Sequence, residues 1–531
     1  MSAIPYDAPY GWDVIECPSI PSVSSSTVLG GNNIRFSIEQ GSELYVYNGK
    51  NSTIGLQLQI VMVDENGDQR TLQPIINTGT REEPTCISIP HLCPNPAGAM
   101  IDTAKAVLKG VEFNNIQYAS SASTMYRMLY ESKLEQDTTA SLSAIKPMSQ
   151  DDQETDIGVI YDGYKKLAGI VGVDDDDPTA EPATYATTEF SKLFSRRMIW
   201  ALKNQMYNFD RHMTNRLHLQ IPLPFFFCDE LIHLGSGEKL DVILGISSNW
   251  YRNLIQCVGS FASELIGTAP GYGEYKVTNK NSNFENNTIN VSVTDMKLYL
   301  ARGYITSTYV PRSVRTTYYM KSFSPSVANL ALTSTTTVTG TFDAIGKITH
   351  VIIGFNVKSD FPKYSTTDFS CGFSQRTLTQ MDADGLSEAK NTTDGVSMIR
   401  QIQLKLGQSI YPQETYTINI NEANGTDVSN TNDLFRCYQD FCTMTDALRT
   451  PVGSLMSYSQ WMCNKLFVFK THQSMNDTSK VYSVKVDLNG TLATPTDIYI
   501  LGLYDNYLTL EYDDQSRLRS MLPSPAVPLL E

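Results

Sequence analysis

Short segments in which apolar and polar residues alternate are the feature that most limits what this chain can fold into. Residues 54–60 read Ile-Gly-Leu-Gln-Leu-Gln-Ile, and residues 401–406 read Gln-Ile-Gln-Leu-Lys-Leu. A period of two places every second side chain on the same face of a strand, so these segments predict strands with one buried face. Candidate strands fall into two groups, before and after a turn-rich stretch near residues 303–325, with about eight in each group.

The composition agrees with a large β protein. Of the 531 residues, 18% are charged, 41% are hydrophobic and 10% are aromatic, whereas about 25% of residues are charged in an average soluble protein. Aromatic and β-branched side chains suit strands. The 41 basic and 56 acidic residues give a net charge of −15, which argues against nucleic-acid binding through a basic surface. A coiled coil, a collagen-like chain and a disordered acidic chain are excluded as well.

We therefore expect a mainly β protein of two tandem eight-stranded jelly rolls, with a helical and acidic insertion in the first. The helical patterns lie at Ala104–Val111, Thr124–Lys133, Ile157–Ile170 and from Phe190 to about Asn208. Acidic runs at 150–154 and 174–178 are most simply solvated loops. The expected organisation is an N-terminal arm (1–30), a first jelly roll (31–305, insertion about 100–213), a linker (306–325), a second jelly roll (326–515) and a C-terminal arm (516–531).

Both ends of the chain read as extended arms. Tyr6, Tyr10 and Trp12 lie among prolines and serines, and aromatic rings are unusual in a disordered tail. The first arm can dock on another molecule or lie as a strap on its own domain, and the sequence leaves both open. Prolines at positions 523, 525 and 528 argue against regular structure in residues 518–531. Leu529 and Leu530 make this end apolar, so both ends are candidate inter-subunit arms.

No group of residues predicts catalysis, a cofactor or a metal site. The nine cysteines contain no Cys-x-x-Cys pair, so buried free thiols in strands are a better interpretation than zinc ligands. None of the six histidines belongs to a metalloprotease or nucleophile motif, and no phosphate-binding loop is present. The first residues lack a signal-peptide pattern and no apolar run is long enough to span a membrane, so we expect a protein kept in a reducing compartment.

One segment carries a family resemblance. Residues 219–227 read Leu-Gln-Ile-Pro-Leu-Pro-Phe-Phe-Phe, which resembles the Pro-Leu-Pro-Phe strand of double jelly-roll major capsid proteins. Residues 293–300 look like the last strand of the first roll in that family, and residues 402–412 resemble a strand-turn-strand of the second. The motif residues, to which the resemblance gives a structural role, are Pro222, Leu223, Pro224, Phe225, Phe226 and Phe227. Two prolines remove backbone donors, so the segment should lie at a strand end or sheet edge.

The resemblance implies a structural protein without enzymatic activity. Family members occur in virophages, polinton-like viruses and large algal DNA viruses, with adenovirus hexon more distant, and the insertion favours a virophage or polinton-like relative. The implied assembly is a homotrimeric, pseudo-hexagonal capsomer in an icosahedral shell of a double-stranded DNA virus. Its partners would be neighbouring capsomers and minor capsid and penton proteins, without direct nucleic-acid binding. The implied location is the virion, assembled in the host cytoplasm or a virus factory.

A different class of protein also fits a β-rich chain. A carbohydrate-binding or glycan-processing β-sandwich would use exposed aromatic residues such as Trp250, Tyr251 and Trp461 as platforms for sugar rings, with clustered carboxylates as the site. The expected absence of a signal peptide counts against it. Mass measurement and binding to an oligosaccharide column separate the two.

Overall fold

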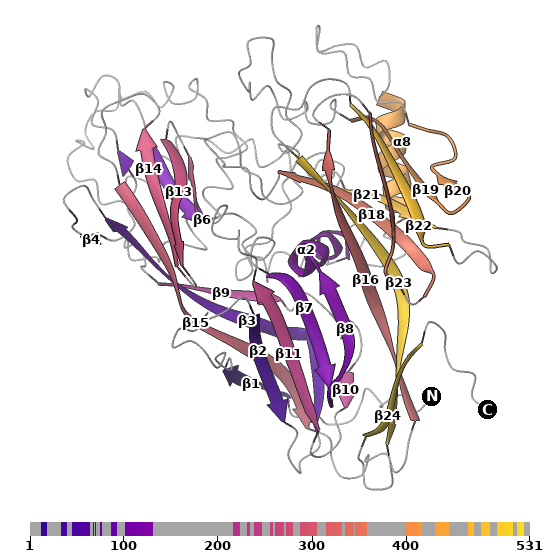
Figure 1. Ribbon diagram of the computed structural model, residues 1–531, viewed down its shortest axis with the longest axis horizontal. Coiled ribbons are helices and arrows are strands. Elements are labelled where there is room, and N and C mark those ends of the chain that lie inside the picture. The colour runs from indigo at the N-terminus through magenta and orange to yellow at the C-terminus, as the bar shows by residue number, and fades with distance from the viewer. Residues whose placement is uncertain are drawn as a thin grey trace, which may run out of the picture.

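The computed structural model (Figure 1) consists mainly of antiparallel strands in two groups, one from each half of the chain. The structure describes residues 12–18, 33–39, 45–63, 67, 69–70, 75–76, 87–92, 101–130, 216–222, 231–233, 238–246, 255–258, 261–269, 272–279, 287–304, 315–331, 335–344, 346–357, 399–416, 431–444, 466–471, 479–488, 496–512 and 518–524. Statements about structure below refer to these residues.

The first roll contains two sheets. In one, the strands lie in the order β1-β15-β3-β10, and β9 pairs with β3 beside β10. In the other, the order is β2-β11-β7-β8. The strands are β1 (Trp12–Pro18), β2 (Asn33–Glu39), β3 (Tyr45–Val63), β7 (Ile101–Leu108), β8 (Val111–Gln117), β9 (Arg216–Pro222), β10 (Leu231–His233), β11 (Lys239–Ile246) and β15 (Asn287–Tyr304).

Short additional strands extend the first roll. β13 (Phe261–Ala269) and β14 (Tyr272–Asn279) pair with each other, and β14 pairs with the first part of β15, which enlarges that sheet. β12 (Ile255–Val258), β6 (Ile87–Leu92) and β5 (Ile75–Ile76) form a separate three-stranded sheet. β4 (Gln69–Arg70) pairs with the end of β3. These strands lie toward one end of the roll, on the left in Figure 1.

The second roll repeats the arrangement with fewer additions. One sheet has the order β16-β23-β18-β21, with β24 beside β23, and the other has the order β17-β22-β19-β20. The strands are β16 (Arg315–Leu330), β17 (Thr335–Thr341), β18 (Ile348–Val357), β19 (Ile399–Leu406), β20 (Ser409–Tyr411), β21 (Phe467–Lys470), β22 (Val481–Leu488), β23 (Thr496–Tyr512) and β24 (Leu518–Ser524).

Both rolls have the same topology. If the main strands of each roll are counted along the chain, one sheet contains the first, eighth, third and sixth strands, and the other contains the second, seventh, fourth and fifth. In the first roll β9 and β10 share the sixth position. This order is that of a jelly roll. The expected fold of two tandem eight-stranded jelly rolls is therefore confirmed.

The second, seventh and fourth strands match residue by residue between the rolls. Lys239 pairs with Glu39 in the first roll as Val481 pairs with Thr341 in the second. The turn after the fourth strand bonds to the seventh strand in both: Lys109 N–H donates to the Lys239 carbonyl at 3.1 Å, and Gly407 N–H donates to the Val481 carbonyl at 2.9 Å. A register shift also occurs at the same end of the fourth strand in both rolls. The duplication thus extends to the register.

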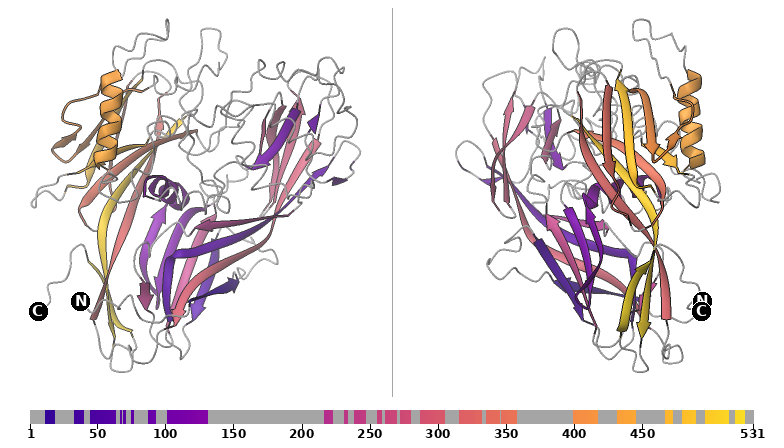
Figure 2. Two further views of the ribbon diagram at one scale, coloured as in Figure 1. Left: turned by 180° about the vertical axis from the view of Figure 1, so that it is seen from behind. Right: turned by 45° about the vertical axis from the view of Figure 1, so that its right-hand side comes forward.

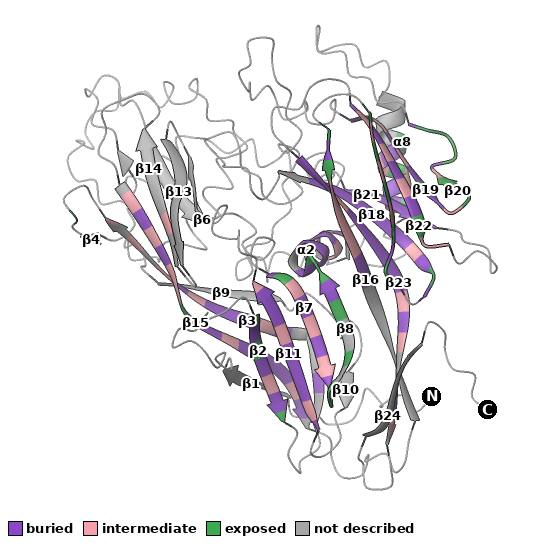
Figure 3. Cartoon of the chain, in the orientation of Figure 1, coloured by how far each residue is buried: buried purple, intermediate pink, exposed green. Residues whose placement is uncertain are grey.

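The hydrophobic core of each roll follows from the alternation of apolar and polar residues along its strands. In Figure 3 the described strands show buried residues alternating with intermediate or exposed ones. Ile54, Leu56 and Leu58 of β3 are fully buried, as are Ile402 and Leu404 of β19, whereas Gln57 and Gln403 between them are partly exposed. Burial of one apolar face of each strand holds each pair of sheets together. The predicted faces are confirmed for residues 401–406 and for 54 and 56–59, whereas Gly55, predicted to face outward, is buried beside the Tyr299 ring.

Connections at the two ends of each roll differ in length. Antiparallel strands place alternate connections at opposite ends, and Figure 1 shows β8 and β11 pointing toward the same end of the first roll. At the opposite end the connections are short: residues 40–44, 109–110, 234–238, 305–314, 342–347, 407–408, 471–480 and 513–517. The connections that follow β3, β8, β18 and β20 at the other end span 64–100, 118–215, 358–398 and 412–466. We call the two ends the short-connection end and the long-connection end.

The predicted helical insertion is wrong at its beginning. Residues 101–117 form β7 and β8 rather than a helix, and Ala104, Ala106 and Leu108 are buried with a period of two. The Thr124–Lys133 pattern overlaps the helix α2 (Ala119–Tyr130), which follows β8 directly. The patterns at 157–170 and 190–208 lie outside the described residues, so a helical insertion is not confirmed.

Parts of the predicted arms and linker are strands. Trp12 begins β1, which pairs along its whole length with β15 of the same chain, so this part of the N-terminal arm is the first strand of the first roll. The range predicted as linker includes the beginning of β16 at Arg315. β24 occupies the first part of the C-terminal arm, where Pro523 pairs in register with Leu508. Our expectation that prolines exclude regular structure there is wrong for residues 518–524.

Candidate assembly surfaces

The contact between the two rolls is built by α2 and β8 of the first roll against β16 and β23 of the second. Figures 1 and 2 show α2 between the rolls. Ala122, Met125 and Leu129 of this helix are fully buried. The Tyr126 ring lies edge-on to Phe323 of β16, with ring centroids 5.2 Å apart. This contact fixes the first roll against the second through an aromatic pair.

A second aromatic contact lies where β8 turns into α2. Tyr118 has a left-handed backbone with φ of 49°, which costs a non-glycine residue roughly 1–2 kcal/mol. Its ring lies 6.4 Å from that of Tyr499 in β23, again edge-on. Burial raises the pKa of the Tyr499 phenol, the charge of Asp497 raises it further, and a hydrogen bond with Ser121 only partly opposes this. The phenol therefore stays protonated and uncharged in the contact between the rolls.

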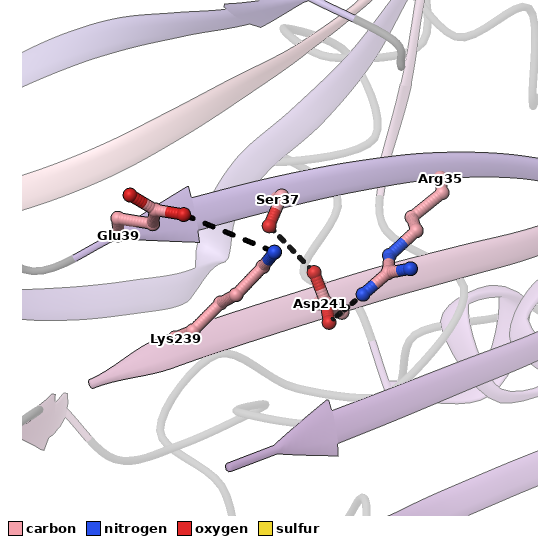
Figure 4. A network of polar contacts seen from close by, with 5 residues as sticks. All are labelled: Arg35, Ser37, Glu39, Lys239 and Asp241. Atoms are coloured by element: carbon pink, nitrogen blue, oxygen red, sulfur yellow. Dashed lines mark hydrogen bonds and ion pairs between the residues drawn. The ribbon is translucent and has the colours of Figure 1, made fainter. Parts of the chain in front are cut away.

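The outer face of the sheet β2-β11-β7-β8 carries ion pairs across its strands, and we call it the ion-paired face. Figure 4 shows its centre, where Arg35 donates to one Asp241 oxygen and the Ser37 hydroxyl donates to the other at 2.6 Å. Lys239 Nζ lies 3.8 Å from Glu39 Oε1 on the neighbouring strand. Lys105 and Glu112 add a pair with a nitrogen–oxygen distance of 3.6 Å. The face is thus charged but locally neutralised.

Asp241 is the most buried member of this face, with its side chain 9% exposed. Burial by itself raises the pKa of the carboxyl. The hydrogen bonds from Arg35 and Ser37, together with the positive charges of Arg35 and Lys239, outweigh burial and hold the pKa below its ordinary value. Asp241 therefore remains ionised and joins β11 to β2.

We expect Asp241→Asn to lower the free energy of unfolding by about 1.5–3 kcal/mol at neutral pH, because charge-assisted hydrogen bonds are lost. Since the folded-state pKa is lowered, this stabilisation is fully present above the unfolded-state pKa of about 3.9 and disappears as the pH falls through the lower folded-state value. Urea denaturation between pH 7 and 3 measures it. Asp295→Asn is the control, because that carboxylate and its partner Lys297 are both substantially exposed, and a change below about 0.5 kcal/mol is expected. Equal effects of both substitutions would contradict the prediction.

The matching face of the second roll, on the sheet β17-β22-β19-β20, is less charged. Four exposed threonines of β17 line one edge, and we call this surface the threonine face: Thr335, Thr337, Thr339 and Thr341. Val481 takes the place of Lys239, and Ile410 takes the place of Glu112. Lys485 and Asp487 form a pair at 3.1 Å on this face. Equivalent sheets of one chain therefore present different chemistry to their surroundings.

The helix α8 (Thr431–Met444) is held firmly against the second roll. The Tyr416 hydroxyl donates to the Asp440 carboxylate, and burial together with this bond raises the pKa of the Tyr416 phenol. The Arg436 guanidinium lies 5.5 Å from the centre of the Tyr416 ring and 3.3 Å from Glu414. Cys437, Phe441 and Cys442 are buried, and both cysteines are free thiols. Both are buried free thiols, as predicted, but the prediction that the cysteines lie in strands is wrong for these two, because they belong to the helix α8.

Most residues singled out from the sequence lie outside the described part. Pro222 is the last residue of β9 and pairs with Thr53, which agrees with the expected strand end. Trp12 is the first residue of β1 and pairs with Gly303. Outside the described residues lie Leu223, Pro224, Phe225, Phe226, Phe227, Tyr6, Tyr10, Leu529 and Leu530. The sequence analysis predicted neither the aromatic contacts of α2 nor the ion-paired face. The alternation of residues in β2 and β11 could have indicated that the charged side chains of the ion-paired face point outward.

Two further properties concern the described residues. They contain no group of three or more His, Cys, Asp or Glu side chains placed to hold a metal ion. Among the helices that the structure describes, none is long and apolar enough to cross a membrane.

Solved structures of viral proteins share this fold. The chain has the double jelly-roll fold of viral major capsid proteins. It is similar to a chain in the cryo-EM structure of the Sputnik virophage, at a TM-score of 0.50 and 11% identity, over 97% of this chain and 89% of that one. Mavirus major capsid protein gives a TM-score of 0.47 at 9% identity, over 98% and 91% of the two chains. Faustovirus major capsid protein gives 0.46 at 10% identity, over 96% and 92%. No protein-family model and no curated protein sequence matches the chain.

Proposed function

We propose that this protein is a structural major capsid protein that forms a homotrimeric, pseudo-hexagonal capsomer of an icosahedral double-stranded DNA virus shell. The observation that carries the proposal is the pair of jelly rolls with one topology and one register, held side by side by α2. Three copies of such a chain supply six similar units, which can close a ring and tile a shell. The protein would be located in the virion, after assembly in the host cytoplasm or a virus factory.

The proposed partners are further copies of the chain, then minor capsid and penton proteins. A net charge of −15 disfavours direct contact with packaged DNA. The long-connection end is the better candidate for the outer surface, because long loops tolerate variation and carry recognition. We propose the domain organisation 31–305 and 326–515 for the two rolls, extended at their beginnings by β1 and by the part of β16 from Arg315.

The mass of the purified protein tests the proposal. We expect three times 59.1 kDa in solution, measured by light scattering or native mass spectrometry, and hexagonal particles or shells in electron microscopy. A stable monomer that binds an oligosaccharide column would overturn the proposal in favour of a carbohydrate-binding β-sandwich protein.

A further inference from the structure

The second roll receives the first on the outer face of the sheet β16-β23-β18-β21. In β23, Gly502 faces the core, because a side chain at this position would meet the Phe342 ring. Its neighbour Leu503 therefore lies on the outer face, where it is fully buried. Phe323 of β16 is in register with Leu503 and contacts Tyr126 of α2. The outer face of this sheet is thus a buried layer, and α2 of the first roll covers it at β16 (Figures 1 and 2).

A histidine lies in the middle of this layer. His350 of β18 is in register with Leu503 on one side and with Lys470 of β21 on the other. The four strands therefore place Phe323, Leu503, His350 and Lys470 in one row. The His350 side chain belongs to a residue that is only 8% exposed, and the next residue on the same face of β18, Ile352, is fully buried. A titratable imidazole is thus enclosed among apolar side chains.

Two hydrogen bonds determine which imidazole nitrogen carries the proton. The Thr349 hydroxyl donates its only hydrogen to the Leu503 carbonyl at 3.2 Å. His350 Nδ1 lies 3.1 Å from the same Thr349 oxygen, which can then only accept, so Nδ1 is the nitrogen that donates. In the neutral ring the second nitrogen, Nε2, is therefore the one that takes up a proton when the pH falls.

Protonation of His350 places a second positive charge opposite Lys470. Residues in register across antiparallel strands have Cβ atoms about 4.5–5.5 Å apart, and like charges in this position are destabilising. An acidic residue on the same face, Asp505, lies two residues beyond Leu503 and is in register with Lys321 of β16. The imidazolium would therefore form in a buried layer, with an ammonium group as the charge directly opposite it, and burial of a charge is costly.

The other charged groups on the surrounding described elements lie further along the chain or have contacts of their own. α8 packs against β21, but its Arg436 lies 3.3 Å from Glu414 and its Asp440 accepts a hydrogen bond from Tyr416. The remaining charged residues are the exposed Lys347 before β18 and Arg127 of α2. Both are positive, so neither favours an imidazolium.

We propose that His350 is a pH-sensitive switch whose protonation loosens the buried layer between the rolls, so that acidification weakens the contact of α2 with β16. A charged imidazole is stable when it is hydrated, and its hydration requires the layer that it forms with Leu503 and Phe323 to open. This opening removes the surface on which Tyr126 packs. The inference concerns contacts within one chain and does not depend on the proposed capsid function.

Acidification should therefore increase the population of the opened form. In the opened form the imidazole titrates with its ordinary pKa of about 6.5, whereas the closed form disfavours the proton. The ratio of opened to closed protein should rise about eightfold between pH 7.0 and pH 5.5. Hydrogen exchange of the full-length protein, followed by mass spectrometry and corrected for the intrinsic pH dependence of amide exchange, measures this ratio as lost protection in peptides from α2, β16 and β18.

Two variants and a matched control test the role of the imidazole. His350→Asn keeps an N–H donor near the position of Nδ1 but does not titrate, so protection should change by less than about twofold between the two pH values. Lys470→Met removes the opposing charge and should give a smaller pH effect than the wild type. His218→Asn is the control, because His218 lies in β9 of the corresponding sheet of the first roll, in register with the half-buried Gln57. This variant should retain the wild-type change.

The comparison uses the ratio between two pH values in each variant, so a general loss of stability in one variant does not affect it. Wild-type protein with equal protection of these peptides at pH 7.0 and pH 5.5 would overturn the inference. A His350→Asn variant that keeps the wild-type pH effect would overturn it as well. Neither outcome bears on the mass of the particle, which tests the proposed function separately.

Discussion

Replacing Tyr482 with alanine should lower the free energy of unfolding by about 3–5 kcal/mol, the usual cost of removing a large buried aromatic side chain. Tyr482 is 2% exposed, and its ring centroid lies 4.4 Å from that of Phe342. The hydroxyl donates to Ser326 Oγ at 2.7 Å, which ties the two sheets of the second roll together. Equilibrium denaturation in urea, followed by circular dichroism, measures the change.

Two variants separate packing from hydrogen bonding at this site. Tyr482→Phe keeps the ring and should cost only about 1 kcal/mol, the usual net contribution of one hydrogen bond. Val481→Ala changes the neighbouring exposed residue, and we expect a change within about 0.5 kcal/mol. If Tyr482→Phe proves as destabilising as the alanine variant, ring packing is not what stabilises this part of the roll.

Deleting residues 518–531 should leave the proposed trimer intact but reduce the proposed shell assembly by about tenfold or more, equivalent to a loss of about 1.4 kcal/mol. β16, β23 and β24 form a ribbon that extends below the rest of the second roll in both views of Figure 2. Removing β24 leaves the end of β23 without a partner strand on one side and changes a surface that, in the proposed shell, would be available to neighbouring capsomers. Light scattering for the trimer and electron microscopy for shells measure the two effects.

A shorter deletion serves as the control. Removal of residues 525–531 keeps β24 and its pairing with β23, so it distinguishes the strand from the apolar residues that follow it. Shell assembly that is lost equally in both deletions would assign the contact to residues 525–531. Loss of the trimer itself on deletion of 518–531 would show that this end is a strap within the trimer, contrary to our expectation.

The strands and their buried faces could be read from the sequence wherever polar and apolar residues alternate cleanly. Gln403 and Lys405 flank Leu404 in β19, and the buried face is the one predicted. The same rule places Phe36 inside and Arg35 outside in β2. Alternation reports which face of a strand is buried, because a shift of one residue would expose the whole apolar set.

The pattern in β7 was misread because alanine favours helices. Ala104 and Ala106 suggested a helix, yet Lys105 and Val107 lie on the opposite face with the period of a strand. Helix propensity differs by less than about 1 kcal/mol per residue, and pairing with β11 and β8 on both sides outweighs it here. Tertiary pairing therefore decided the structure of this segment.

Contacts between distant segments could not be predicted. Pro523 is compatible with β24 because that strand lies at a sheet edge, where a missing donor is tolerated, but the edge position depends on β23 and not on local sequence. The pair of Tyr126 and Phe323 likewise joins residues far apart in the chain. No period or spacing encodes such a contact, so the surface between the rolls was not predicted.

The difference between the ion-paired face and the threonine face has a consequence for binding stoichiometry. A ring of three copies would present six similar rolls in outline, but the two chemistries would alternate around it. A partner that recognises the Arg35–Asp241 network would find three binding positions per ring, because the equivalent of Asp241 in the second roll is Ser483. Such a partner would bind with threefold symmetry to a ring whose outline has nearly sixfold symmetry.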